Sequence, residues 1–110
     1  MELMLWALRK RRPWRVQGTS MCPVFDDGDL VIVDPAAANA VDAGDVIVAR
    51  HPFKNVEIIK YVDAVVDDLV AVRSPSGDDS RQFGRVPVHT IRGRVTANLT
   101  KRAIVARSRS

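Results

Sequence analysis

Between residues 24 and 107 the chain is a series of short runs rich in valine and isoleucine, separated by clusters of glycine, aspartate, proline and serine. β-Branched side chains suit the pleated backbone of a strand, and the residues of the clusters suit tight turns. No segment after residue 12 keeps the apolar spacing of a helix. We therefore predict a mainly β chain whose strands lie at residues 30–34, 45–50, 56–66, 69–74, 90–99 and 103–106.

A short repeat marks the start of two of these strands. The sequence at residues 28–33, which begins with Gly-Asp, is echoed at residues 44–48. Glycine followed by aspartate favours a tight turn. We interpret both copies as turns that lead into strands, rather than as ligand sites.

The composition fits one soluble domain. Of the 110 residues, 46% are hydrophobic and 27% are charged, which excludes a disordered chain. A domain of this size buries roughly 65% of the surface that its unfolded chain exposes, enough for one core. No window approaches the roughly 20 apolar residues of a membrane helix. The single cysteine, Cys22, cannot form an internal disulfide, and we expect no metal site.

The net charge of +4 is unevenly distributed. Residues 1–21 carry five basic and one acidic side chain, residues 22–91 carry six basic and twelve acidic ones, and residues 92–110 carry six basic and no acidic ones. Basic ends of this kind are typical of solvated tails. They are also of the size that binds phosphates or an anionic membrane surface.

The N-terminal segment combines an apolar stretch, residues 1–8, with a basic cluster, residues 9–12. A cleavable signal has the opposite order, with its basic residues first. We interpret the apolar stretch as a short helix that can lie at a membrane interface but is too short to span the membrane. The predicted organisation is an apolar-basic segment at 1–15, a β domain at 16–99 and a basic tail at 100–110.

Residues 18–23, Gly-Thr-Ser-Met-Cys-Pro, lie just ahead of the first predicted strand. A serine in so constrained a turn can expose its hydroxyl, while nearby backbone N–H groups can face a developing oxyanion. By itself the segment is most often only a turn. Ser20 is a candidate nucleophile if a base lies close to it.

Lys60 is the candidate base. On a strand its face also holds Val56, Ile58 and Val62, and a lysine is rarely buried among apolar side chains. Burial lowers the pKa of a lysine, so that it can be neutral and accept a serine proton. The alternative is a lysine whose ammonium reaches solvent at the sheet edge.

Three other residues could act as bases. His51 precedes a proline at the end of a strand, His89 lies in a loop, and Lys54 lies in a turn. We interpret all three as surface residues.

A third segment, residues 77–87, contains Asp79, Ser80 and Arg81 followed by Phe83. The aspartate and the arginine are close enough to form an ion pair that fixes the loop, and the phenylalanine can anchor it in the core.

Taken in order, these segments resemble the type I signal peptidases and their small relatives. That clan of serine/lysine peptidases also includes the self-cleaving domains of SOS-type repressors. The resemblance covers residues 16–95 and rests on the motifs at 18–29, 44–48, 59–62 and 79–87. It implies the catalytic core of that clan, a small, partly open β-barrel formed by a coiled sheet, here preceded by the short apolar-basic segment.

The resemblance also implies roles for individual residues. Ser20 is the nucleophile and Lys60 the general base, and Met21 helps to wall the pocket for the residue before the cleaved bond. The Ser20 N–H supplies part of the oxyanion hole. Many relatives have a serine two residues before the nucleophile that helps to hold the oxyanion. Here that position is Gly18, so the side-chain donor is absent or comes from Thr19.

In the third segment, the resemblance implies that Asp79, Ser80 and Arg81 brace the dyad without taking part in the chemistry. Many relatives carry a serine two residues before the aspartate that orients the lysine. Here that position is Gly77, and Ser76 or Ser80 is the candidate replacement.

The membrane anchor and the insert domain of the larger signal peptidases are not expected in a chain of this size. Among compact relatives, the sequence Arg-Gln-Phe-Gly at residues 81–84 most resembles that of the nickel-type superoxide dismutase maturation proteases. The implied function is a cytoplasmic serine endopeptidase, without metal or organic cofactor, that removes an N-terminal extension from a precursor polypeptide such as that of nickel superoxide dismutase.

Two alternatives stay open. One is a general signal-peptide peptidase that attaches peripherally to a membrane through its basic ends. The other is a noncatalytic module whose basic ends hold nucleic acid or a membrane surface. If the chain is the maturation protease that the resemblance implies, no nucleic acid partner is expected.

Overall fold

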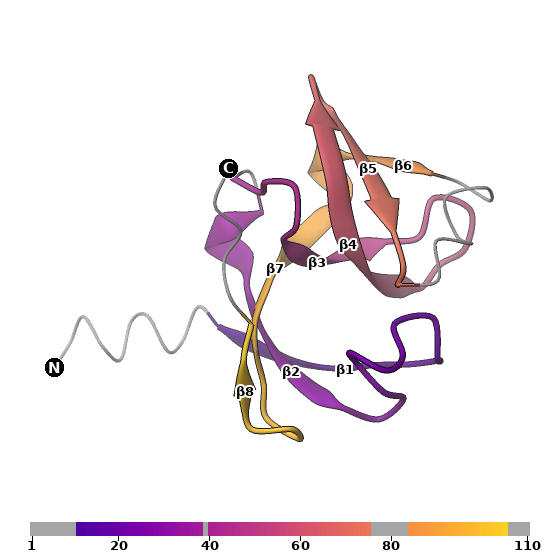
Figure 1. Cartoon of the computed structure of the whole chain (residues 1–110). Helices are drawn as coiled ribbons and strands as arrows, with labels where there is room; N and C mark the ends of the chain where they lie inside the picture. Colours follow the sequence, from indigo (N-terminus) through magenta and orange to yellow (C-terminus); the bar gives the residue numbers. More distant parts are fainter. Residues whose placement is uncertain (1–10, 39, 76–83, 106–110) are drawn as a thin grey trace, which may run out of the picture.

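The computed structural model describes residues 11–38, 40–75 and 84–105. In these ranges the chain forms one antiparallel sheet, shown in Figure 1. Its strands are β1 (Arg12–Arg15), β2 (Leu30–Asp34), β3 (Val46–Arg50), β4 (Glu57–Val66), β5 (Leu69–Arg73), β6 (Arg85–Pro87), β7 (Ile91–Asn98) and β8 (Ala103–Ile104). Two short 3-10 turns, η1 (Pro35–Ala37) and η3 (Val88–Thr90), follow β2 and precede β7. The prediction of a mainly β chain with a coiled, partly open sheet is confirmed.

The order of the strands is β1-β2-β7-β3-β4-β5-β6, with β8 beside β7. β7 is the central strand, because its second half pairs with β2 and β8 and its first half pairs with β3. The register shifts where β7 meets β2 and again where it meets β3, and such bulges bend a sheet. Figure 1 shows the result, a sheet that curls so that β1 and β2 lie at one end and β5 and β6 at the other.

The curl divides the apolar side chains between two cores. The first contains Val16, Met21, Phe25, Val31, Val33, Val46, Val48, Ile59 and Val95. The second contains Val41, Ile47, Ala49, Val62, Val70, Val72, Val86 and Ile91. Successive residues of β3 alternate between the two cores, so this strand is apolar on both faces.

The repeated Gly-Asp sequences form two equivalent turns, as predicted. Gly28 and Gly44 have φ values of +88° and +91°, which an L-residue rarely adopts. In each turn the aspartate after the glycine is buried, and its Oδ2 accepts a hydrogen bond from the amide three residues earlier, at 3.0 Å for Asp29 and 2.9 Å for Asp45. These aspartates satisfy the backbone of their own turns, which explains their burial.

The predicted strand at 30–34 matches β2, and five other predictions overlap β3, β4, β5, β7 and β8. β1 and β6 are not predicted from the sequence pattern. β1 carries two arginines and a proline on an exposed edge, and β6 has only three residues, so neither shows a clear alternation. The division of the chain at residues 15 and 99 stays a prediction.

Candidate active site

Ser20 lies in the loop between β1 and β2, where its side chain is exposed. The loop is built from consecutive turns: the Cys22 amide donates to Thr19 O at 3.0 Å, and the Phe25 amide donates to Met21 O at 2.9 Å. Met21 and Phe25 are 1% and 2% exposed and pack in the first core. The loop is therefore anchored from below while it presents the serine hydroxyl outward.

Lys60 lies in β4 and is only 5% exposed. Its face of the strand also holds Val62, which is fully buried, and Ile58, which is half-buried. The predicted apolar face is confirmed for these two residues. It is wrong for Val56, which lies outside the strand and is 48% exposed.

The two side chains meet although forty residues separate them in sequence. The Nζ of Lys60 donates a hydrogen bond to the Oγ of Ser20 at 3.0 Å. Burial lowers the pKa of Lys60 from its ordinary value of 10.5, because the charged form loses its hydration. When the amine is neutral, the same contact lets the serine hydroxyl donate its proton to Nζ.

Thr19 is exposed beside Ser20, and Met21 lies beneath it in the core. Gly18 has φ +86°, and its amide donates to Oδ1 of Asp27 at 2.8 Å. A side chain at this position would sit on strained backbone, which glycine avoids. The roles assigned to Thr19 and Met21 stay predictions.

Asp79, Ser80 and Arg81 lie outside the described residues, as do Ser76 and Gly77. Their proposed support of the dyad stays a prediction.

Ser74 is a residue near Lys60 that the sequence pattern did not single out. It is 1% exposed and follows β5. Tyr61 of β4 pairs with Arg73 of β5, so continuing this register by one residue places Ser74 opposite Lys60. The signal in the sequence is weak, since a serine at the end of a strand is ordinary until the pairing of the strands is known.

The other candidate bases lie elsewhere. His89 and Lys54 are exposed, in agreement with their interpretation as surface residues, whereas His51 is half-buried. The Nδ1 of His51 accepts hydrogen bonds from the amides of Phe53 and Lys54, at 3.0 and 3.1 Å. Burial, then the charges of Lys54 and Lys60, lower its pKa. This nitrogen serves the turn that precedes β4.

Two strands of the described chain, β1 and β4, have edges without a pairing strand. Within the described chain, β1 pairs only with β2, and the first four residues of β4 pair only with β3. One contact bridges the two edges: the Trp14 indole N–H of β1 donates to Oε1 of Glu57 of β4 at 3.1 Å. The other oxygen of Glu57 lies 3.2 Å from Nε of Arg92. The edges of β1 and β4 are therefore joined at the first residue of β4, three residues before Lys60.

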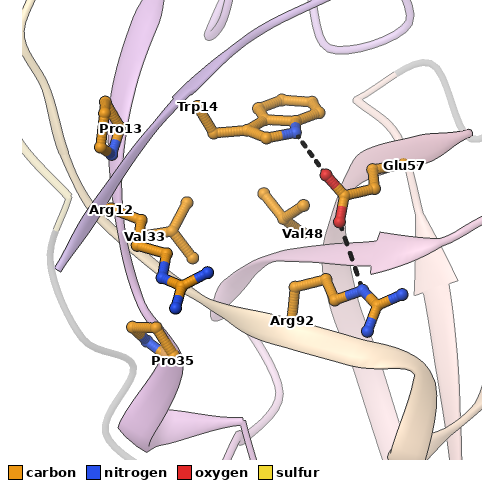
Figure 2. A pocket seen from close by; sticks show the side chains of 8 residues that line it. All are labelled: Arg12, Pro13, Trp14, Val33, Pro35, Val48, Glu57 and Arg92. Carbon is orange, nitrogen blue, oxygen red and sulfur yellow. Dashed lines mark hydrogen bonds and ion pairs between the residues drawn. The ribbon is translucent and has the colours of Figure 1, made fainter. Parts of the chain in front are cut away.

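A pocket of about 420 Å³ lies at this bridge. Figure 2 shows the Glu57 carboxylate between the Trp14 indole and the Arg92 guanidinium, with Arg12 on another wall. Glu57 and Lys60 are three residues apart on β4, which corresponds to roughly 10 Å along the strand. The remaining walls are apolar, formed by Pro13, Val33, Pro35 and Val48.

Two absences apply to the residues described. In 11–38, 40–75 and 84–105 no three histidine, cysteine or acidic side chains gather in a way that could hold a metal ion. The same stretches contain no helix with the length and hydropathy needed to cross a membrane.

The chain is similar to known peptidases. The profile of the Peptidase S24-like family matches residues 13–96. The mitochondrial inner membrane protease subunit 1 of Xenopus tropicalis is 33% identical over 104 aligned positions, which cover 71% of this chain and 62% of that relative. The chain thus spans less than two thirds of the length of this relative. Both matches agree with the resemblance to signal-peptidase-like peptidases, and the family match includes Ser20 and Lys60.

Proposed function

Since the chain belongs to the Peptidase S24-like family, we propose that it is a serine endopeptidase with Ser20 as nucleophile and Lys60 as general base. One observation carries this assignment: an exposed hydroxyl lies 3.0 Å from a buried amine. An exposed nucleophile can reach a polypeptide, and a buried lysine can be neutral near working pH.

The chemistry follows from this pair. Neutral Lys60 takes the proton of the Ser20 hydroxyl as Oγ attacks the carbonyl carbon of the substrate. The charged lysine then gives a proton to the leaving amine, and an acyl-enzyme on Ser20 remains. A water molecule, deprotonated by the regenerated amine, hydrolyses this ester and releases the second product.

The oxyanion of each tetrahedral intermediate is held by backbone N–H groups of the Ser20 loop, with Thr19 as a candidate side-chain donor. Each well-placed donor in a comparable site contributes about 3 to 4 kcal/mol. The loop is suited to this role because Met21 and Phe25 fix it to the core.

The substrate binds as an extended strand between the open edges of β1 and β4, so that main-chain hydrogen bonds set its register. A small side chain before the cleaved bond fits near Met21. The pocket at Trp14 and Glu57, about three residues along β4 from Lys60, receives a further side chain. These two sites together determine which bond reaches Ser20.

The substrate we propose is a precursor with an N-terminal extension, and the resemblance at residues 81–84 favours nickel superoxide dismutase. The protein acts in the cytoplasm, with weak contact to a membrane surface through its basic ends. A second candidate is the removal of signal peptides at a membrane surface. The similarity to a protease subunit named for the mitochondrial inner membrane favours this second candidate.

The substrate is tested by incubating the purified chain separately with a nickel superoxide dismutase precursor and with a secretory preprotein, and by measuring the intact mass of the products. Cleavage of the first at one bond supports the proposed substrate. Cleavage of only the second supports the membrane-side alternative. Cleavage of neither substrate contradicts both, and salt-sensitive binding to nucleic acid or anionic vesicles would then favour the noncatalytic module.

A further inference from the structure

A lysine distant in sequence, Lys101, contacts the loop that carries Ser20. Lys101 lies in the turn between β7 and β8, and its Nζ lies within 3.5 Å of four oxygens of the segment 23–29. These oxygens are Pro23 O at 2.9 Å, Val24 O at 3.1 Å, Asp26 Oδ2 at 3.0 Å and Asp29 Oδ2 at 3.5 Å. Two of them are backbone carbonyls only three and four residues after Ser20.

The residues that support Lys101 are hydrogen-bonded to one another and to the backbone. Asn98 is 2% exposed, and its Nδ2 donates to Oδ2 of Asp29 at 2.9 Å while its Oδ1 accepts from the Lys101 amide at 3.1 Å. The start of β2 is bound to the same turn, since the Leu30 amide donates to Oγ1 of Thr100 at 2.8 Å. The turn that carries Lys101 is therefore bound to the start of β2 by several hydrogen bonds.

The charges of the cluster persist at neutral pH. The hydrogen bond from Lys101 is the largest cause that lowers the pKa of Asp26. Burial alone would raise the pKa of Asp29, but the hydrogen bonds from Asn98 and the Asp26 amide and the charge of Lys101 lower it overall. The hydrogen bond with Asp26, and then the charges of Asp26 and Asp29, raise the pKa of Lys101. At neutral pH an ammonium therefore lies among the four oxygens.

We infer that Lys101 is a positioning residue, which fixes the backbone after Ser20 and so keeps the serine hydroxyl aligned with Lys60. This inference rests on the proposed function. The Ser20 hydroxyl is exposed, so little packing around the side chain itself holds it in place. Its position depends on the backbone of the loop, which the buried side chains of Met21 and Phe25 anchor in the core and to which Lys101 binds at two carbonyls.

A shift of about 1 Å at a reacting group can reduce a rate about 100-fold. We therefore expect Lys101→Ala to lower kcat by about 10-fold to 100-fold and to leave KM within about threefold, because substrate binds along β1 and β4 rather than at Lys101. The rate is measured at a temperature at which the variant is fully folded, so that a merely structural role would leave kcat unchanged.

The missing part of the side chain in Lys101→Ala corresponds to propylammonium, which provides a specific rescue. We expect this ion to restore kcat in a concentration-dependent way, and uncharged 1-propanol to have no effect. Lys101→Met fills the same space without the charge, and we expect it to be slow and not rescued. Arg102→Ala, at the neighbouring exposed position, is the matched control and should keep the wild-type kcat.

The outcomes separate the two claims. If the wild type cleaves its substrate and Lys101→Ala has the same kcat, the positioning role is wrong while the proposed function stands. If kcat falls and propylammonium does not restore it at any concentration, the role assigned to the ammonium is wrong. If the wild type itself cleaves neither precursor, the proposed function fails and the inference fails with it.

Discussion

The Nζ of Lys60 lies 3.0 Å from the Oγ of Ser20, and the two side chains differ sharply in exposure, since the lysine is 5% exposed and the serine is open to solvent. The base is therefore desolvated while the nucleophile stays accessible. This arrangement makes the proton acceptor available at a pH where a free lysine would be charged.

The pH dependence of cleavage tests the state of Lys60. Because burial lowers the pKa of this lysine from 10.5, its neutral, active form increases as the pH rises through a pKa below that value. We expect kcat/KM to increase about tenfold per pH unit on the acidic side and then to level off. Lys60→Arg, which stays charged, should be inactive throughout. A profile that falls as the pH rises over this range would contradict Lys60 as the base.

Ser74 is expected to orient Lys60. The strand register places it opposite the lysine, and it is 1% exposed. Loss of its hydroxyl in Ser74→Ala should lower kcat about tenfold, equivalent to about 1.4 kcal/mol, and move the midpoint of the pH profile. Ser74→Thr, which keeps the hydroxyl, should restore much of the rate. An unchanged rate and midpoint in Ser74→Ala would show that the hydroxyl does not serve the lysine.

The Trp14 and Glu57 bridge is expected to affect substrate binding rather than chemistry. Trp14→Ala removes an indole wall of the pocket and its hydrogen bond to Glu57. We expect KM to rise about tenfold, which corresponds to about 1.4 kcal/mol of lost binding, with kcat changed much less. Trp14→Phe keeps the apolar wall, so its KM should lie between those of the wild type and Trp14→Ala. Steady-state kinetics on a peptide substrate decide the point, and a fall in kcat with constant KM would be the contrary result.

Gly93 is expected to be required for the close packing of β7 against β2. A Cβ at this position of β7 would lie 2.6 Å from Asp34 O and 2.7 Å from Cγ1 of Val33, both on β2. Gly93→Ala should therefore lower the free energy of unfolding by about 1 to 3 kcal/mol, as overpacking does. Leu99→Ala, at a 50% exposed position next to β7, is the control and should change it by less than about 0.5 kcal/mol. Equal stabilities in denaturant titrations would refute the close packing.

Much of the fold could be predicted because local and tertiary preferences agree. The valine and isoleucine runs are strands, and β2 begins and ends at the predicted residues. β1 could not be predicted, since arginine and proline on an exposed edge leave no alternating pattern. β3 shows the related limit: its continuous apolar run identifies a buried strand, but only the curl reveals that its faces belong to two cores.

The sequence singles out Ser20 and Lys60 as candidates, but it does not reveal the residues around them. By pattern alone Ser20 is most often only a turn serine and Lys60 can be a lysine that reaches solvent, so the resemblance to the serine/lysine peptidases is needed to select them. The roles of Trp14, Ser74 and Lys101 depend on strand pairing and on a distant turn, which local sequence does not encode. In the sequence, a tryptophan between a proline and an arginine and a lysine in a basic stretch look like ordinary surface residues.

We assign Ser20 and Lys60 as the catalytic pair, and the decisive experiment is cleavage of the precursor by the wild type, Ser20→Ala and Lys60→Met. Methionine fills the buried site of the lysine without a charge, and Ser20 is exposed, so both variants should unfold with about the free energy of the wild type. We expect the wild type to cleave one bond. The rate should fall at least about 10³-fold in Ser20→Ala and about 10²-fold to 10⁴-fold in Lys60→Met. If folded Ser20→Ala or Lys60→Met cleaves the same bond at the wild-type rate, the assignment of the catalytic pair is wrong.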